Sequence, residues 1–179
     1  VEALTGGIGL AFFLKFGFTF AFFSSFGFSA ALIVIAFIDL DHRIIPDVIS
    51  FPGIIVGFLL AIFGPSLTVK ESFIGLLAGG GSLYVVALVY KALTKREGMG
   101  GGGVKLLAMV GAWLGWKAIL FTLFFASLSG TFIGGGLMFL KGEGRLYAIP
   151  FGPFLAFSGL AYVFLGPELI AWYLNWGRL

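Results

Sequence analysis

The chain has 179 residues, of which 60% are hydrophobic and only 11% are charged, whereas a soluble domain carries about 25% charged residues. It has no cysteine and one histidine, which excludes disulfides, zinc–thiolate sites, a cysteine nucleophile and multi-histidine metal sites. The net charge of +3 gives no indication of a nucleic-acid partner. We therefore expect a protein whose surface mostly faces the lipid bilayer and which uses no metal or cofactor.

Long apolar runs follow one another along the whole chain. Because a membrane-spanning helix needs about 20 apolar residues, with a range of about 17–25, these runs favour an all-α, polytopic transmembrane bundle of about six to seven spans. No linker divides them, so residues 1–179 are expected to form a single integral-membrane domain. The candidate spans are 3–14, 18–38, 48–63, 73–93, 104–116, 118–140 and 149–165, and the aromatic stretch 168–176 is typical of a membrane interface.

Basic residues gather on alternate connections between these runs. The richer set is Arg43, Lys91, Lys95, Arg96, Lys105, Lys141 and Arg145, and the poorer set is Lys15, Lys70, Lys117 and Arg178. The positive-inside rule places the richer set in the cytoplasm. Trp172, Tyr173 and Trp176 are then expected at the outer interface, where aromatic rings are enriched.

Three carboxylates and the only histidine lie between the second and third apolar runs, in Asp39-Leu-Asp-His-Arg-Ile-Ile-Pro-Asp47. Ionisable groups at a span end are costly to keep and indicate function, although a span may simply end in solvated charges. Asp39 falls at a helix C-terminus, where the helix dipole and burial both disfavour the ionised carboxylate. Such a carboxyl group suits proton exchange. Asp41 would not face Asp39 on a helix, whereas Arg43 could pair with it.

Pro46 disfavours helix at the residue before it, so the acidic tract is expected to break there. Asp47 then fits the N-cap of the following helix, and Ser50 is a competing cap. His42 is expected to be a loop or interface residue.

The second polar feature is Glu97-Gly-Met-Gly-Gly-Gly-Gly-Val-Lys-Leu106. A dinucleotide fingerprint would need a preceding strand, and a P-loop would need Gly-Lys-Ser/Thr, so neither phosphate site is indicated. A glycine loop that lets backbone approach an extended peptide fits better. Further glycines recur at four-residue spacing, at positions 75 and 79, 111 and 115, and 130 and 134, which predicts close helix packing.

Together, these tracts resemble the signatures of the type IV prepilin peptidases, membrane aspartic proteases of the GxGD type related to the archaeal preflagellin peptidases. Asp39–Asp47 resembles the first signature. Gly98-Met-Gly-Gly-Gly-Gly-Val-Lys-Leu-Leu-Ala, followed by Gly111-Ala-Trp-Leu-Gly115, resembles the second, which has the form G-x-G-D. Ile149-Pro-Phe-Gly-Pro153 resembles a third element that opens the last span.

The resemblance implies roles for particular residues. Asp39 would be the first catalytic aspartate, and Gly103 occupies the position of the second. The supporting positions would be Asp41, Asp47, Lys105, Gly100 and Gly102. Members of the family cleave the basic leader of type IV prepilins and pseudopilins after a glycine, at the cytoplasmic face of the inner membrane. The expected partners are therefore the prepilin signal helix and the bilayer.

The chain departs from this family pattern in two ways. Gly103 is not an aspartate, and no carboxylate occurs between Gly98 and Leu140. Because an aspartic protease needs two carboxyl groups that share a proton, we expect the chain to be inactive. Family members also begin with a further span and a cysteine-containing cytoplasmic segment. The chain opens at Val1-Glu2 and has no cysteine, so we expect a fragment and assign it no methyltransferase activity.

The sequence is also compatible with two other functions. Gly103 is compatible with a non-catalytic pseudo-peptidase that holds the prepilin signal helix. Asp39 and Asp41 would also suit a small proton or cation transporter, because broken helices with glycine-rich segments occur in transporters. Carboxylates near a span end, rather than at mid-bilayer, weaken the transporter hypothesis.

Overall fold

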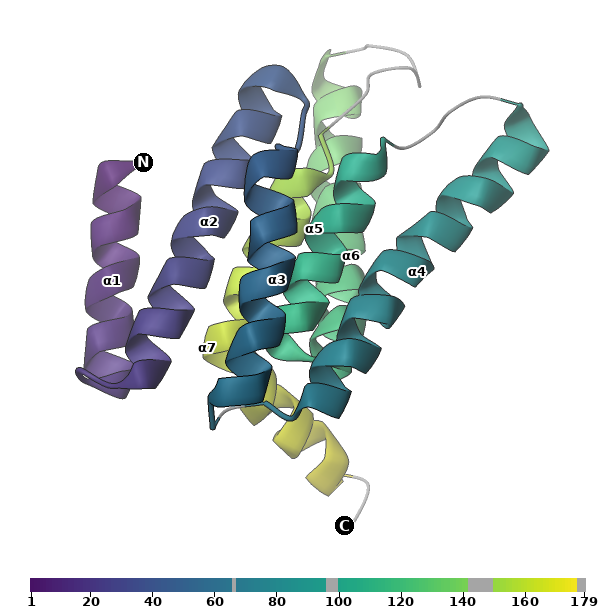
Figure 1. Ribbon diagram of the computed structural model, residues 1–179. Helices are drawn as coiled ribbons and strands as arrows, with labels where there is room; N and C mark the ends of the chain where they lie inside the picture. The colour runs from purple at the N-terminus through teal and green to yellow at the C-terminus, as the bar shows by residue number, and fades with distance from the viewer. Residues whose placement is uncertain (66, 96–99, 142–149, 177–179) are drawn as a thin grey trace.

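The chain folds into a bundle of helices in the computed structural model, which describes residues 1–65, 67–95, 100–141 and 150–176. The helices in this part of the chain are α1 (Glu2–Phe16), α2 (Phe20–His42), α3 (Asp47–Phe63), α4 (Val69–Thr94), α5 (Gly101–Leu114), α6 (Trp116–Lys141) and α7 (Gly152–Trp176). The ends of α2, α4 and α6 and the starts of α3, α5 and α7 lie at one end of the bundle, the upper end in Figure 1. The predicted all-α bundle is confirmed.

Three helices in the described residues are long and apolar enough to cross a membrane: Phe20–His42, Val69–Thr94 and Trp116–Gly136. Asp47–Phe63, Gly101–Leu114 and Gly152–Gly166 are apolar but shorter. Large apolar side chains cover the outside of the bundle, including Leu14, Phe63 and Phe132. A surface of this kind is expected in lipid and not in water. The protein is a helical membrane protein, and the total of about six to seven spans stays a prediction.

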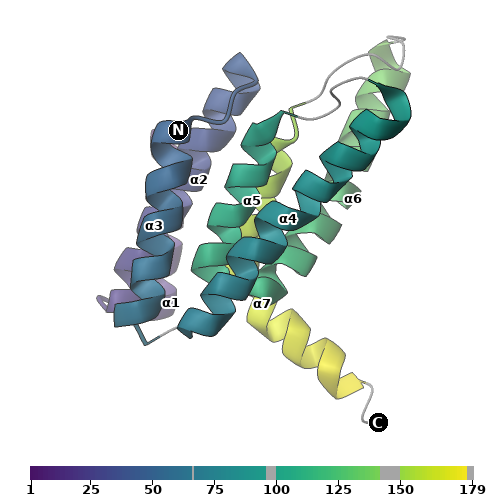
Figure 2. The same ribbon diagram turned by 45° about the vertical axis from the view of Figure 1, so that its right-hand side comes forward.

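Helix α5 lies at the centre of the bundle, in contact with α3, α4, α6 and α7 (Figures 1 and 2). Leu106, Leu107, Met109 and Val110 of this helix are fully buried. A helix enclosed in this way has its position fixed by packing on several sides. Its first turn, which contains Gly103, is therefore held firmly against its neighbours.

Glycines allow α4 and α5 to cross with their backbones in contact. A Cβ atom added to Gly75 would collide with the Gly111 carbonyl, and one added to Gly111 would collide with the Gly75 carbonyl. Gly79 lies in the same way against the carbonyl oxygen of Leu107. The predicted close packing is confirmed at these positions. Gly130 makes only ordinary contact, 3.8 Å from the Phe154 ring to its added Cβ atom.

The substitution Gly75→Ala tests this crossing. We expect it to lower the free energy of unfolding by about 1–3 kcal/mol, because the added methyl group forces the two backbones apart. Gly81→Ala is the matched control in the same helix, since a Cβ atom there would meet nothing within 4 Å. Thermal unfolding of both variants in detergent micelles makes the comparison. Equal midpoints for the two variants would contradict the close crossing.

Several element boundaries differ from the sequence predictions. Helix α4 begins at Val69, earlier than expected, because Thr68 and Glu71 form a reciprocal capping box. Helix α7 continues to Trp176, so 168–176 is not a separate segment. Helix α5 begins at Gly101, and the run 101–103 is therefore helical where a loop was expected.

Candidate active site

A cavity of about 870 Å³ opens at the end of the bundle where α2 ends and α3, α5 and α7 begin. It contains carboxylates, cations and a glycine run contributed by segments far apart in the sequence. Its lining consists of Asp39, Arg43, Ile44, Ile45, Asp47, Gly100, Gly101, Gly102, Gly103, Lys105, Pro150, Phe151 and Gly152. The acidic tract, the glycine tract and the start of the third motif therefore meet at one place. Gly98, Met99 and Ile149 of these motifs lie outside the described residues.

Asp39 is held rigidly in the last turn of α2. Its side chain is only 5% exposed. The carboxylate oxygen Oδ2 accepts a hydrogen bond of 2.9 Å from the backbone N–H of Gly152, at the start of α7. A buried carboxylate needs such a donor, because burial without a partner is costly. No other partner is recorded for this carboxylate in the described part of the chain, so its second oxygen is left for a water molecule or a substrate.

The other residues at the end of α2 point elsewhere or play a backbone role. Asp41 and His42 are exposed and do not line the cavity. This agrees with the expectation that Asp39 and Asp41 would not face each other on a helix. Arg43 ends α2 in the left-handed conformation, with φ of 57°, and its N–H donates to the Asp39 carbonyl at 2.9 Å. The supporting role predicted for Asp41 has no geometric counterpart in the cavity.

Gly103 is buried in the first turn of α5, three positions after the N-cap residue Gly100. Gly102 packs so closely on the loop between α2 and α3 that an added Cβ atom would lie 2.8 Å from the Ile45 Cβ atom. Gly101, by contrast, is exposed, and an added Cβ atom there would meet nothing within 4 Å. Position 103 is thus at a helix N-terminus, where a carboxylate is stabilised by free N–H groups and the helix dipole.

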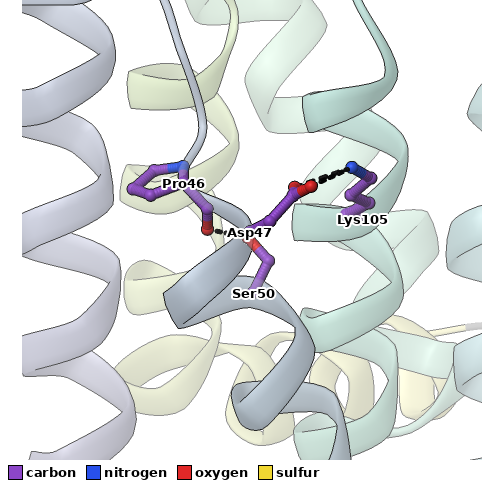
Figure 3. Close-up of polar contacts among 4 residues, drawn as sticks. All are labelled: Pro46, Asp47, Ser50 and Lys105. Carbon is purple, nitrogen blue, oxygen red and sulfur yellow. Dashed lines mark hydrogen bonds and ion pairs between the residues drawn. The ribbon is translucent and has the colours of Figure 1, made fainter.

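Lys105 of α5 and Asp47 of α3 both line the cavity and form an ion pair between the two helices (Figure 3). The lysine Nζ lies 2.6 Å and 2.8 Å from the two oxygens of the Asp47 carboxylate. The same ammonium group lies 5.1 Å from the centroid of the Phe51 ring, within cation–π range. The geometry fits the supporting positions predicted for both charged residues, and their catalytic importance stays a prediction.

The predicted N-cap at Asp47 is wrong. The N-cap of α3 is Pro46, with no side-chain cap, and Asp47 is the first helical residue. One position past the N-cap, its carboxylate forms an ion pair with Lys105. Ser50 does not cap either, since its hydroxyl donates to the Pro46 carbonyl at 3.0 Å (Figure 3).

One residue that positions Asp39 was not predicted from the sequence. Gly152 supplies the N–H that holds the carboxylate, and a Cβ atom added there would overlap the Asp39 side chain. The motif at 149–153 was recognised as typical of the family, but nothing in it indicated which acid it would contact. That contact depends on how α2 and α7 pack.

The site offers acid–base chemistry from one carboxyl group. Among the described residues no group of three His, Asp or Glu side chains could hold a metal ion. Asp39 faces a cavity large enough for an extended peptide segment, beside the N-terminus of α5. A second carboxyl group placed at the start of that helix would complete an acid pair of the kind that can share one proton.

The fold and the cavity define a polytopic membrane protein with a buried acid at one end of its bundle. The model of the type IV leader peptidase family matches residues 26–135, which include both Asp39 and Gly103. The chain therefore belongs to the type IV leader peptidase family, and the resemblance seen in its sequence motifs is confirmed.

Its relatives include proteins named prepilin leader peptidase/N-methyltransferase. The chain is 36% identical to the one from Aeromonas hydrophila over 98% of its own length and 60% of that protein. It is 37% identical to the one from Xanthomonas campestris pv. campestris over its full length and 62% of that protein. The chain thus spans about 60% of the length of these curated relatives. No solved structure matches it significantly.

Proposed function

We propose that the chain is the membrane-embedded core of a prepilin peptidase, an aspartic endopeptidase in which the second acid is replaced by Gly103. The observation that carries this proposal is that Asp39 and Gly103 line the same cavity. The corresponding enzyme would cleave the basic leader of a type IV prepilin or pseudopilin after a glycine. With glycine at position 103, the chain binds this substrate but does not cleave it.

The loss of activity follows from the chemistry of an acid pair. One carboxylate activates a water molecule, and its protonated partner polarises the scissile carbonyl group. Removing a group that transfers a proton costs about 10²–10⁴ in rate. The other acids that the structure describes near this end are unsuited to replace it: Asp47 is engaged by Lys105, and Asp41 is exposed outside the cavity.

We place the cavity at the cytoplasmic face of the inner membrane. The connections at its end of the bundle carry most of the basic residues, and the positive-inside rule assigns such connections to the cytoplasm. Asp39 is the one acid in the cavity without an ion-pair partner among the described residues. It is therefore free to act on the peptide in the cavity, while the apolar signal helix of the substrate would lie along the lipid-exposed side of the bundle.

A non-catalytic prepilin-binding protein is the second candidate, and Gly103 favours it. In this case the cavity would serve to hold the leader, and an acid at position 103 would add nothing. Co-purification of a tagged prepilin with the chain, before and after Gly103→Asp, separates the two. If the Gly103 chain co-purifies with prepilin and the Gly103→Asp variant cleaves it, the chain is a peptidase that has lost one catalytic acid. If both proteins co-purify with prepilin and neither cleaves it, the chain is a binding protein.

A further inference from the structure

A second cavity lies at the other end of α5, away from Asp39. It has a volume of about 290 Å³ and lies between the start of α4, the junction of α5 and α6, and the middle of α7. In Figures 1 and 2 these segments lie toward the lower end of the bundle. Its lining includes Leu67, Glu71, Trp113, Trp116, Lys117 and Tyr162. The proposed peptide cleavage at the upper end makes no use of it.

Tyr162 brings a hydroxyl group to the lining of this cavity. The residue is 8% exposed, and its ring packs edge-on against Phe121 with 5.3 Å between centroids. Within the described residues its hydroxyl group has no hydrogen-bond partner. This hydroxyl group can therefore donate a hydrogen bond to a ligand in the cavity that supplies an acceptor.

Two opposite charges, Glu71 and Lys117, line the same cavity and do not form an ion pair with each other. The Glu71 oxygen Oε2 accepts from the N–H and the hydroxyl of Thr68, at 3.3 Å and 2.8 Å, and Oε1 has no hydrogen-bond partner among the described residues. Lys117 makes no ion pair among the described residues, and its ammonium lies 5.8 Å from the Trp116 ring centroid. A cation and an anion held apart around a small cavity match a ligand that carries both charges.

An apolar stripe leads from the cavity along α6. Trp116 lines the cavity and is 39% exposed, and Leu120 and Phe124, one and two turns further on, are 64% and 62% exposed. Side chains four residues apart share one face of a helix, so these three form a continuous surface on the outside of the bundle. The tryptophan at the mouth is typical of a membrane interface. A ligand with a zwitterionic head and apolar chains fits both features.

We propose that this cavity binds the headgroup of a zwitterionic phospholipid with a primary ammonium group, of the phosphatidylethanolamine class. Lys117 and the Tyr162 hydroxyl donate hydrogen bonds to the phosphate, and Glu71 accepts from the ammonium. The acyl chains lie along Trp116, Leu120 and Phe124. The site is independent of catalysis, because it lies at the opposite end of α5 from Asp39 and Gly103.

Native mass spectrometry of the full chain tests this site, with phosphatidylethanolamine and phosphatidylcholine of identical acyl chains. We expect the ethanolamine lipid to be retained about tenfold more strongly, because the trimethylated choline head cannot donate to Glu71 and a hydrogen bond to a charged group is worth about this factor. Glu71→Gln keeps the capping-box geometry and should remove the preference. Lys117→Gln and Tyr162→Phe should weaken the retention of both lipids.

Lys70→Gln is the matched control, since Lys70 is an exposed cation at the same end of α4 that does not line the cavity. It should retain both lipids as the parent chain does. Equal retention of the two lipids by the parent chain would overturn the proposal. So would unchanged retention in all three cavity variants, or displacement of the lipid by soluble phosphoethanolamine at equal concentration.

Discussion

Gly103→Asp should raise the rate of leader cleavage by about 10²–10⁴-fold, the contribution of a positioned group that transfers a proton. Gly103 is buried in the first turn of α5 and lines the cavity with Asp39. Cleavage is measured in membranes with a prepilin substrate, from the fraction of the substrate that loses its leader.

The two helix ends give the restored pair an asymmetry that catalysis needs. Position 103 lies at the start of α5, where the helix dipole favours a carboxylate, whereas Asp39 is buried at the end of α2 and accepts one backbone hydrogen bond, from Gly152. Acids held in environments that differ in this way take different roles, one as base and one as acid. The asymmetry comes from the fold and does not require further polar residues.

Two variants control this restoration. Gly101→Asp adds the same charge to the same helical turn and the same cavity, but at an exposed position. It should not restore cleavage, because only the buried position 103 is expected to hold a carboxyl group against Asp39. Adding Asp39→Asn to Gly103→Asp should remove the restored activity, because one member of the pair is lost. A folded Gly103→Asp chain without cleavage, or equal activity from Gly101→Asp, would contradict the assignment of the pair.

Gly152→Ala should lower the restored activity of the Gly103→Asp chain by about 10²-fold, the cost of displacing a reacting group by about 1 Å. The N–H of Gly152 holds the Asp39 carboxylate at 2.9 Å, and a methyl group on Gly152 would overlap that carboxylate. The acid must therefore move away from its position in the cavity. Cleavage rates and prepilin co-purification are measured together, and we expect the rate to fall while binding persists.

The control for this substitution is Gly159→Ala in the same helix. A Cβ atom there would lie 3.4 Å from Leu32 and Val110 side-chain atoms, a contact that flexible side chains can accommodate. It should leave the cleavage rate near that of the Gly103→Asp chain. If both alanine variants lost activity equally, the effect would belong to the packing of α7 and not to the support of Asp39.

The apolar runs predicted most of the bundle, because helices that face lipid consist of long stretches of apolar residues. The sequence could not show that α5 begins at Gly101, since a run of glycines has no intrinsic preference for helix. Its helical state comes from packing between α3, α4, α6 and α7. In the same way α7 runs on through 168–176, where the aromatic composition alone suggested a separate segment.

For the site, family motifs identified the residues but did not determine their contacts. Asp47 matches a capping residue in its local sequence, yet its partner is Lys105 on another helix. Gly152 is inconspicuous in the sequence, and its role depends on its N–H meeting Asp39 across the bundle. Contacts of this kind depend on tertiary packing, which local sequence patterns do not encode.

The most direct test of the account is whether positions 39 and 103 face each other across one cavity. The chain has no cysteine, so Asp39→Cys with Gly103→Cys creates a single pair of cysteines. Asp39→Cys with Lys117→Cys is the control, because these two positions line the two cavities at opposite ends of the bundle. Both are treated in membranes with a bifunctional thiol reagent that has a two-carbon spacer, and bridging is scored by mass spectrometry. We expect bridging at 39 and 103 and none at 39 and 117; no bridging of the first pair in folded protein would contradict the shared site.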